Sequence, residues 1–143
     1  MACLIRFCRL FARFGRAPDK LGGQVPQAGK LARFVYDSGR LRPGTFKPTP
    51  HQHRLELSTA QRSCVTEKRL WHLGRTKRPD RTLHGRCDFE VRQLPEGLIS
   101  REAAEKGYQE HAVVVGWPDD REEQLKLQVA LVKAAPLKQC PGN

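Results

Sequence analysis

The sequence predicts an α+β domain, in which a small mixed or antiparallel sheet of three to four strands is packed by a C-terminal helix and one or two short helices. Two observations predict this class. Short β-branched or aromatic runs are separated by turn residues, and a capped apolar stripe of helical period lies near the C-terminus. The 143 residues are one domain's length. No apolar run approaches the roughly 20 residues that span a bilayer, so no transmembrane segment is expected.

Four segments have the composition of strands. Residues 33–36 are β-branched and aromatic, and residues 55–60 place two leucines on one face. Residues 87–91 alternate apolar and acidic side chains, which predicts a half-buried strand with its acids facing water. Residues 111–115 form a compact β-branched run, which is typical of an interior strand.

Two short helices are expected between these strands. Thr66 can cap a helix over residues 67–73, and Gly74 is placed to end it in the left-handed conformation. Ser100 can cap a second short helix over residues 101–106.

The C-terminal helix has the strongest signals. It is expected to begin after Asp119 or Asp120, because each has a glutamate three residues later, which is the capping-box arrangement. Leucine, valine and alanine side chains then form a broad apolar stripe, and Pro136 ends the helix.

The first 30 residues are predicted to lie outside this domain, which is expected over residues 31–143. Their N-terminal part is free of acidic side chains, and arginines recur there opposite apolar residues, at Arg6, Arg9, Arg13 and Arg16. Such a helix can bind a membrane surface. It is also typical of a mitochondrial transit peptide, which makes the mitochondrial matrix the alternative to a cytoplasmic location. A flexible tail and an appended upstream sequence are the other interpretations. Residues 15–30 are rich in glycine and proline, which predicts a linker.

The formal net charge of +11 is unevenly distributed. Residues 1–92 hold 20 Lys and Arg against 7 Asp and Glu, whereas residues 93–143 hold 6 against 8. This asymmetry indicates an acidic partner: nucleic acid, an anionic membrane surface or an acidic protein. The five cysteines are odd in number and lack a repeated spacing, which favours reduced thiols.

A basic loop is the candidate nucleic-acid contact. It carries Arg75, Lys77, Arg78, Arg81 and Arg86. Together with this loop, Arg33, Arg40, Arg42 and Lys47 could form a phosphate-contacting surface. No helix-turn-helix, zinc-finger or RNA-recognition signature is present, so backbone contact without strong sequence preference is expected. Trp71 and Trp117 lie beside apolar positions and are predicted core residues, with base stacking as the alternative.

Two further chemistries are compatible with the residue types. His84, Arg86, Asp88 and His111 include acid, base and anion-binding groups, and an enzyme acting on a phosphate- or nucleotide-containing substrate would need them in one cleft. Zinc ligands of acceptable type are also present, at His51, His53, His84 and Cys87. Solvent-exposed histidines and a core cysteine are the simpler interpretation, and no metal or cofactor is predicted.

Several short motifs resemble those of a group of small uncharacterised bacterial proteins, sometimes carried on mobile elements, with the pattern ELSxxR…SEDEIWxxG…LxxRAD…HAxxxGWPxDKxEQ. The residues that carry the resemblance are Glu56-Leu57-Ser58, Thr66-Glu67, Trp71, Gly74, Leu83 to Asp88, His111-Ala112, Gly116 to Asp120 and Glu123-Gln124. The resemblance covers roughly residues 33–135 and implies a bacterial cytosolic protein, without bringing an established activity. This chain departs from the pattern after the ELS triplet, where Ala60 and Gln61 replace an aromatic residue and an arginine.

The leading functional hypothesis is therefore a non-catalytic binding protein. One form of this hypothesis makes the protein an accessory of a mobile element. It would contact a polyanion such as nucleic acid, or a protein partner, through a basic surface. The small phosphate-directed enzyme is the alternative.

Overall fold

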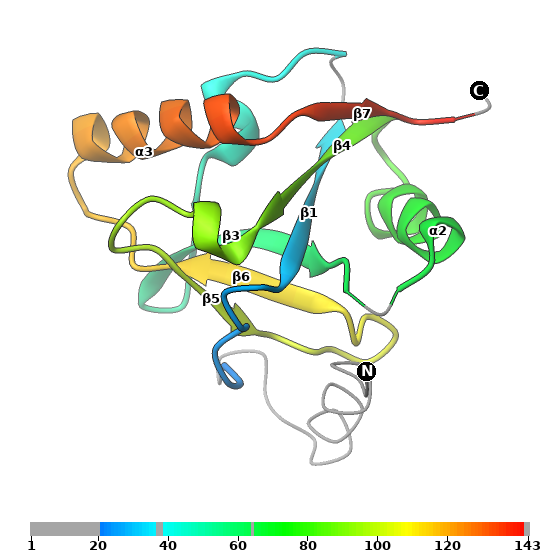
Figure 1. Ribbon diagram of the computed structural model, residues 1–143, viewed down its shortest axis with the longest axis horizontal. Coiled ribbons are helices and arrows are strands. Elements are labelled where there is room, and N and C mark those ends of the chain that lie inside the picture. The colour runs from blue at the N-terminus through cyan, green and yellow to red at the C-terminus, as the bar shows by residue number, and fades with distance from the viewer. Residues whose placement is uncertain (1–20, 37–38, 64, 142–143) are drawn as a thin grey trace.

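The computed structural model describes residues 21–36, 39–63 and 65–141 and confirms the α+β class. Its described part contains one open sheet of seven antiparallel strands and two α-helices (Figure 1). The strands are β1 Lys30–Tyr36, β2 Thr49–His51, β3 Arg54–Gln61, β4 Leu83–Glu90, β5 Ile99–Glu102, β6 His111–Val115 and β7 Leu137–Gln139. Their order across the sheet is β5-β6-β3-β1-β4-β7, with β2 paired to β3 beside this path.

The sheet has more strands than the sequence predicts because β2, β5 and β7 are only three or four residues long. A strand of that length is too short to display an alternating pattern. The four expected strands correspond to β1, β3, β4 and β6, each with its apolar side chains in a core.

The helix predicted over residues 101–106 is wrong. Residues 99–102 form β5, which pairs with β6 in the register Ile99↔Val115 to Glu102↔Ala112. Ser100, expected as a helix cap, is fully buried. The prediction rested on Ser100 as a cap and Gly107 as a stop, but pairing with β6 satisfies the backbone of this segment instead.

Ordered structure begins before Leu31, inside the predicted linker. The Gly22 N–H donates to the Glu102 carbonyl at 2.7 Å, and the Val25 N–H donates to the Ser100 carbonyl at 2.9 Å. Val25 is 2% exposed. Residues 22–25 therefore add backbone pairing along the outer side of β5. The cationic helix predicted around Arg6 to Arg16 lies outside the described residues.

The two α-helices cover opposite faces of the sheet (Figure 1). Adjacent residues of β1 show this division, since Leu31 packs in one core cluster and Ala32 in the other. The helix α3, Arg121–Ala134, contributes Leu131 to the first cluster, and α2, Glu67–Lys77, contributes Leu70 to the second. No helix of the described chain is long and apolar enough to cross a membrane.

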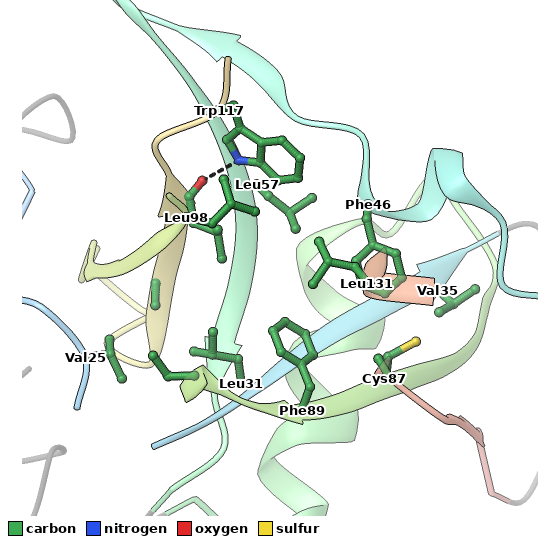
Figure 2. Packing of buried hydrophobic residues seen from close by; sticks show 14 residues of the cluster. Val25, Leu31, Val35, Phe46, Leu57, Cys87, Phe89, Leu98, Trp117 and Leu131 are labelled. Atoms are coloured by element: carbon green, nitrogen blue, oxygen red, sulfur yellow. Dashed lines mark hydrogen bonds between the residues drawn. The ribbon is translucent and has the colours of Figure 1, made fainter. Parts of the chain in front are cut away.

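The larger core cluster lies beneath α3 (Figure 2). Phe46 and Phe89 meet edge to face with ring centroids 6.3 Å apart, and Leu131 packs in the same cluster. Trp117 is 8% exposed and donates its indole N–H to the Val114 carbonyl at 2.9 Å. Trp71 is 5% exposed in the other cluster, so the prediction that both tryptophans are core residues is confirmed.

The predicted C-terminal helix is confirmed as α3. Its cap is Asp120, which accepts from the Glu123 N–H at 3.0 Å. The buried stripe is narrower than the apolar sequence suggests, because Leu125 is 50% exposed.

The helix α2 extends past Gly74 to Lys77, so the predicted stop at this glycine is wrong. Thr66 caps the helix as expected, accepting from the Arg69 N–H at 3.1 Å. Gly74 has helical geometry and lies where α2 comes close to the sheet. A Cβ there would lie 2.8 Å from Leu83 Cδ2 and 2.8 Å from Phe34 Cδ1. The glycine therefore sets the approach of the helix and does not end it.

We expect Gly74→Ala to destabilise the fold. Overpacking of this kind costs about 1–3 kcal/mol, and the better helix propensity of alanine offsets up to about 1 kcal/mol. Urea unfolding should show a lower midpoint for this variant. Gly23→Ala is the control, because a Cβ there meets no atom within 4 Å. Equal midpoints for Gly74→Ala and the wild type would contradict this account.

Candidate anion-binding site

The site is built on an opening between β1 and β3. These two neighbouring strands pair at two positions, Leu31↔Gln61 and Ala32↔Ala60. β1 then continues beside β4 to Tyr36, while β3 pairs with β6. The strands diverge in Figure 1, where β1 and β4 run in a different direction from β3 and β6. Residues 33–36 of β1 consequently have a strand on one side only.

Arg33 lies in this opening. Its Nε donates to the Thr45 carbonyl at 2.8 Å, and its Nη1 donates to the Ser58 carbonyl at 2.8 Å. The side chain therefore connects β1 to β3 and to the segment before β2. No carboxylate of the described chain pairs with it. Burial lowers the pKa of Arg33, yet a guanidinium remains charged in proteins, so among the described residues this charge is balanced by carbonyl dipoles.

A pocket of about 230 Å³ opens beside Arg33. Its lining is formed by Arg33, Phe34, Val35, Tyr36, Arg40, Arg42, Gly44, Thr45 and Arg81. The four arginines come from β1, from the segment after it and from the loop between α2 and β4. No acidic residue of the described chain lines this pocket.

Contacts with α3 and with the larger core hold the segment that carries Arg40 and Arg42. It leads into the 3₁₀ helix η1, Pro43–Phe46, where the ring of Pro43 fixes the first backbone angle. Gln128 of α3 donates its side-chain amide to the Pro43 carbonyl at 2.7 Å. Phe46 is fully buried in the larger core. These contacts hold the wall of the pocket in place.

Arg81 lines the pocket, and its guanidinium lies near the aromatic ring of Tyr36. Its guanidinium carbon lies 5.8 Å from the centroid of Tyr36, a cation–π distance. Tyr36 in turn donates its hydroxyl to the Gly74 carbonyl at 2.6 Å. Burial raises the pKa of Tyr36, so the ring stays neutral and keeps its hydroxyl proton for that bond.

Three other predicted nucleic-acid contacts lie near the C-terminal end of α2. Arg75 donates to Cys140 Sγ and to the Pro141 carbonyl, each at 3.3 Å. Lys77 Nζ lies 4.8 Å from the Tyr108 ring centroid. Arg78 forms an ion pair with Asp80 at 3.4 Å on the exposed loop. Lys47, expected with the phosphate-contacting arginines, is exposed and is not part of the pocket lining.

Arg86 has a different environment from the other residues of the basic loop, because its side chain is fully buried. Its Nε pairs with Asp88 at 2.8 Å, and its Nη2 pairs with Glu67 of α2 at 2.7 Å. The guanidinium carbon lies 4.5 Å from the Trp71 ring centroid. Arg86 thus joins α2 to the sheet and presents no surface to a ligand.

Two more cations complete this ionic cluster. Arg62 pairs with Glu67 at 2.7 Å and with Asp88 at 2.8 Å. Lys138 of β7 lies 3.3 Å from Glu67. The hydrogen bond from Arg86, aided by those from Lys138 and Arg62, lowers the pKa of Glu67 to about 2.

This pKa predicts an acid-sensitive contribution to stability. Because the folded pKa of Glu67 is about 2 and its ordinary value is 4.5, the contribution is complete above pH 4.5 and is lost as the pH falls towards 2. Glu67→Gln removes the titrating group. Urea unfolding should show the wild type more stable than the variant at pH 6, with the difference shrinking between pH 4.5 and pH 2. A difference independent of pH over that range would contradict the assignment.

The residues of the enzyme hypothesis lie in two separate places. Arg86 and Asp88 pair with each other on β4, whereas His111 lies on β6, and strands β3 and β1 separate the two. His111 instead contacts Ser58 and Glu105. Within the described chain, no hydrogen bond or ion pair joins the side chain of His84 or His111 to Arg86 or Asp88.

The described residues form no metal cluster, and another hollow on their surface has mixed charge. They contain no group of three or more His, Cys, Asp or Glu side chains placed to hold a metal ion. A wider hollow of about 510 Å³ lies between the β2–β3 hairpin and the end of β6. Its lining includes both Arg54 and Asp119, so its charge is mixed.

The chain was compared with known proteins in three ways. No family model, no curated protein and no solved structure matches it. The bacterial family suggested by the motifs therefore remains a prediction. Of those motif residues, Glu67, Trp71, Arg86 and Asp88 lie together in the ionic cluster, where they hold α2 against the sheet.

Proposed function

We propose that this protein is a binding protein whose arginine-lined pocket holds backbone phosphates of a nucleic acid, with no catalysis at that pocket. The observation that carries the proposal is Arg33, a partly buried guanidinium with no carboxylate partner among the described residues, facing a pocket lined by three more arginines. A buried charge is costly unless it is compensated. A bound phosphate would supply that compensation.

The chemistry of the lining favours phosphate over other anions of similar charge. The planar guanidinium donates two parallel hydrogen bonds, a geometry that matches two phosphate oxygens. Arg33 is already fixed by its two carbonyl contacts, so little side-chain entropy would be lost when a ligand binds. Arg42 comes from the segment after β1, and Arg81 comes from the loop between α2 and β4. Both line the pocket and would contact the same phosphate group.

The surrounding surface fits a polymer better than a free phosphate. Arg75, Lys77 and Arg78 lie near the end of α2, and the loop after them leads to Arg81. A nucleic-acid backbone crossing the pocket would meet these cations at neighbouring phosphates. Because the contacts are to phosphates and not to base edges, little sequence preference is expected.

The test is binding of the full chain to fluorescently labelled single-stranded and double-stranded DNA and RNA, measured by anisotropy over a range of salt concentrations. The wild type should bind with an affinity that falls steeply as salt increases, because binding releases condensed counterions. In the double variant Arg42→Ala/Arg81→Ala, we expect about tenfold weaker binding or more. The slope of log affinity against log salt should also be shallower by about 1.5.

Arg121→Ala is the matched control, because Arg121 is an exposed arginine at the start of α3 and lies outside the pocket. It removes one arginine charge, against two in the double variant, and should leave the salt slope almost unchanged. Arg33 is kept in these variants because it also connects three segments of the fold. Absent or salt-independent binding would overturn the proposal, as would equal losses in the double variant and the control.

A further inference from the structure

A second group of reactive side chains, none of which lines the arginine-lined pocket, lies on the α2 side of the sheet. Ser58 Oγ is 2.7 Å from Nε2 of His111, and Nδ1 of His111 is 3.1 Å from Oε1 of Glu105. The three side chains thus form a hydroxyl–imidazole–carboxylate series. Such a series is the arrangement that activates a serine nucleophile, and it is recognised by geometry and roles whatever the fold.

Strand pairing places the serine beside the histidine. The register of β3 and β6 puts Ala60 opposite His111 and Ser58 opposite Val113, so Ser58 is the diagonal neighbour of His111 on one face of the sheet. Ser58 is exposed, whereas His111 is 8% exposed. A ligand can therefore reach the hydroxyl while the imidazole behind it is shielded from water.

The carboxylate is fixed by a tight turn in the loop between β5 and β6. The Glu105 N–H donates to the Tyr108 carbonyl at 3.0 Å, and the Tyr108 N–H donates back to the Glu105 carbonyl at 2.9 Å. Gly107 within this turn has φ +77°, a left-handed conformation that glycine adopts without strain. The hydrogen bond with His111 lowers the pKa of Glu105, so the carboxylate is ionised at neutral pH.

The contacts of the His111 ring determine where its proton lies. Nδ1 faces two acceptors, the Glu105 carboxylate and the Ala103 carbonyl at 3.0 Å, so Nδ1 of the neutral ring carries the hydrogen. Nε2 is then the acceptor for the Ser58 hydroxyl. The Tyr108 ring stacks on the imidazole at 4.7 Å between centroids and holds its plane. This tautomer is the one a general base needs.

We propose that Ser58 is a nucleophile in acyl transfer, that His111 is its general base and that Glu105 positions His111. The substrate class is a carboxylic ester or thioester. Ser58 Oγ would bond to the acyl carbon while its proton passes to His111 Nε2. The bond to the alcohol or thiol leaving group then breaks, and that group takes the proton. Water attacks the acyl-serine with His111 again as base, releasing the carboxylic acid and restoring Ser58.

The backbone of Ser58 contacts one residue of the arginine-lined pocket. Arg33 Nη1 donates to the main-chain carbonyl of Ser58, whereas the proposed reaction takes place at the Ser58 side chain. The proposal uses none of the residues assigned to phosphate binding. Ser58→Ala should therefore leave nucleic-acid affinity unchanged, so either proposal can fail without the other.

The test uses a fluorophosphonate probe, which reacts with activated serines, on the full chain. We expect one covalent adduct per chain, located at Ser58 by peptide mass spectrometry and lost in Ser58→Ala. His111→Gln should slow labelling about 10²-fold or more, the usual contribution of a general base. Glu105→Gln should slow it less, and should change the pH dependence of the labelling rate. Ser63→Ala, which removes a serine that instead accepts from the Lys30 N–H, should label like the wild type.

Circular dichroism should show that each variant is folded. If His111→Gln fails to fold, Ser58→Cys gives a second measurement in the otherwise native chain. The thiol that this substitution introduces should react with iodoacetamide at pH 6, where an unassisted thiol is almost entirely protonated, and should do so faster than Cys140. Four results would overturn the proposal: no adduct on the folded wild type, an adduct at another serine, equal rates for the wild type and a folded His111→Gln, or an introduced thiol in Ser58→Cys that reacts no faster than Cys140.

Discussion

The short contact between β1 and β3 determines the rest of this structure. Two residue pairs join these central neighbours, whereas β1 pairs with β4 along its whole length. The sheet is therefore continuous where β1 begins and β3 ends, and the two strands separate past these two pairs. The larger core cluster still combines both halves, with Val35 and Phe89 from β1 and β4 and Leu57 from β3, and Phe46 of η1 and Leu131 of α3 pack in it. Along this opening the strand edges present unpaired backbone N–H and C=O groups, which folded proteins cover.

Arg33 is the residue that fills this edge. Its two carbonyl contacts replace part of the backbone pairing that the diverging strands lack. The charge it brings into the opening is not neutralised by any carboxylate of the described chain. The candidate anion-binding site thus follows from the way the sheet opens, because the group that closes the gap is a cation and its neighbours Arg42 and Arg81 are cations as well.

Two guanidiniums of the described chain, the partly buried Arg33 and the fully buried Arg86, differ in their partners. Arg86 is fully buried but is paired with Glu67 and Asp88 and lies over the Trp71 ring, so its charge and most of its donors are satisfied within the protein. Burial alone would lower the pKa of Arg86, but the hydrogen bonds from its guanidinium to Asp88 and Glu67 raise it. Arg33 pairs with no carboxylate among the residues that the structure describes, and it lines a pocket. Their similar positions in the sequence, each on a strand, give no indication of this difference.

The sequence by itself determined the α+β class, the four longer strands, the N-terminal cap of α2 and the position of α3. Each of these follows from local periodicity or from a capping residue within a few positions, such as Thr66 or Asp120. It also grouped Arg33, Arg40, Arg42 and Lys47 with the basic loop as a phosphate-contacting surface, and that contact stays a prediction. Only the tertiary structure decided that Lys47 lies outside the pocket, that Arg86 is internal, and that Ser58 meets His111 and Glu105. These outcomes depend on strand order and register between distant segments, which side-chain pattern along one chain does not encode.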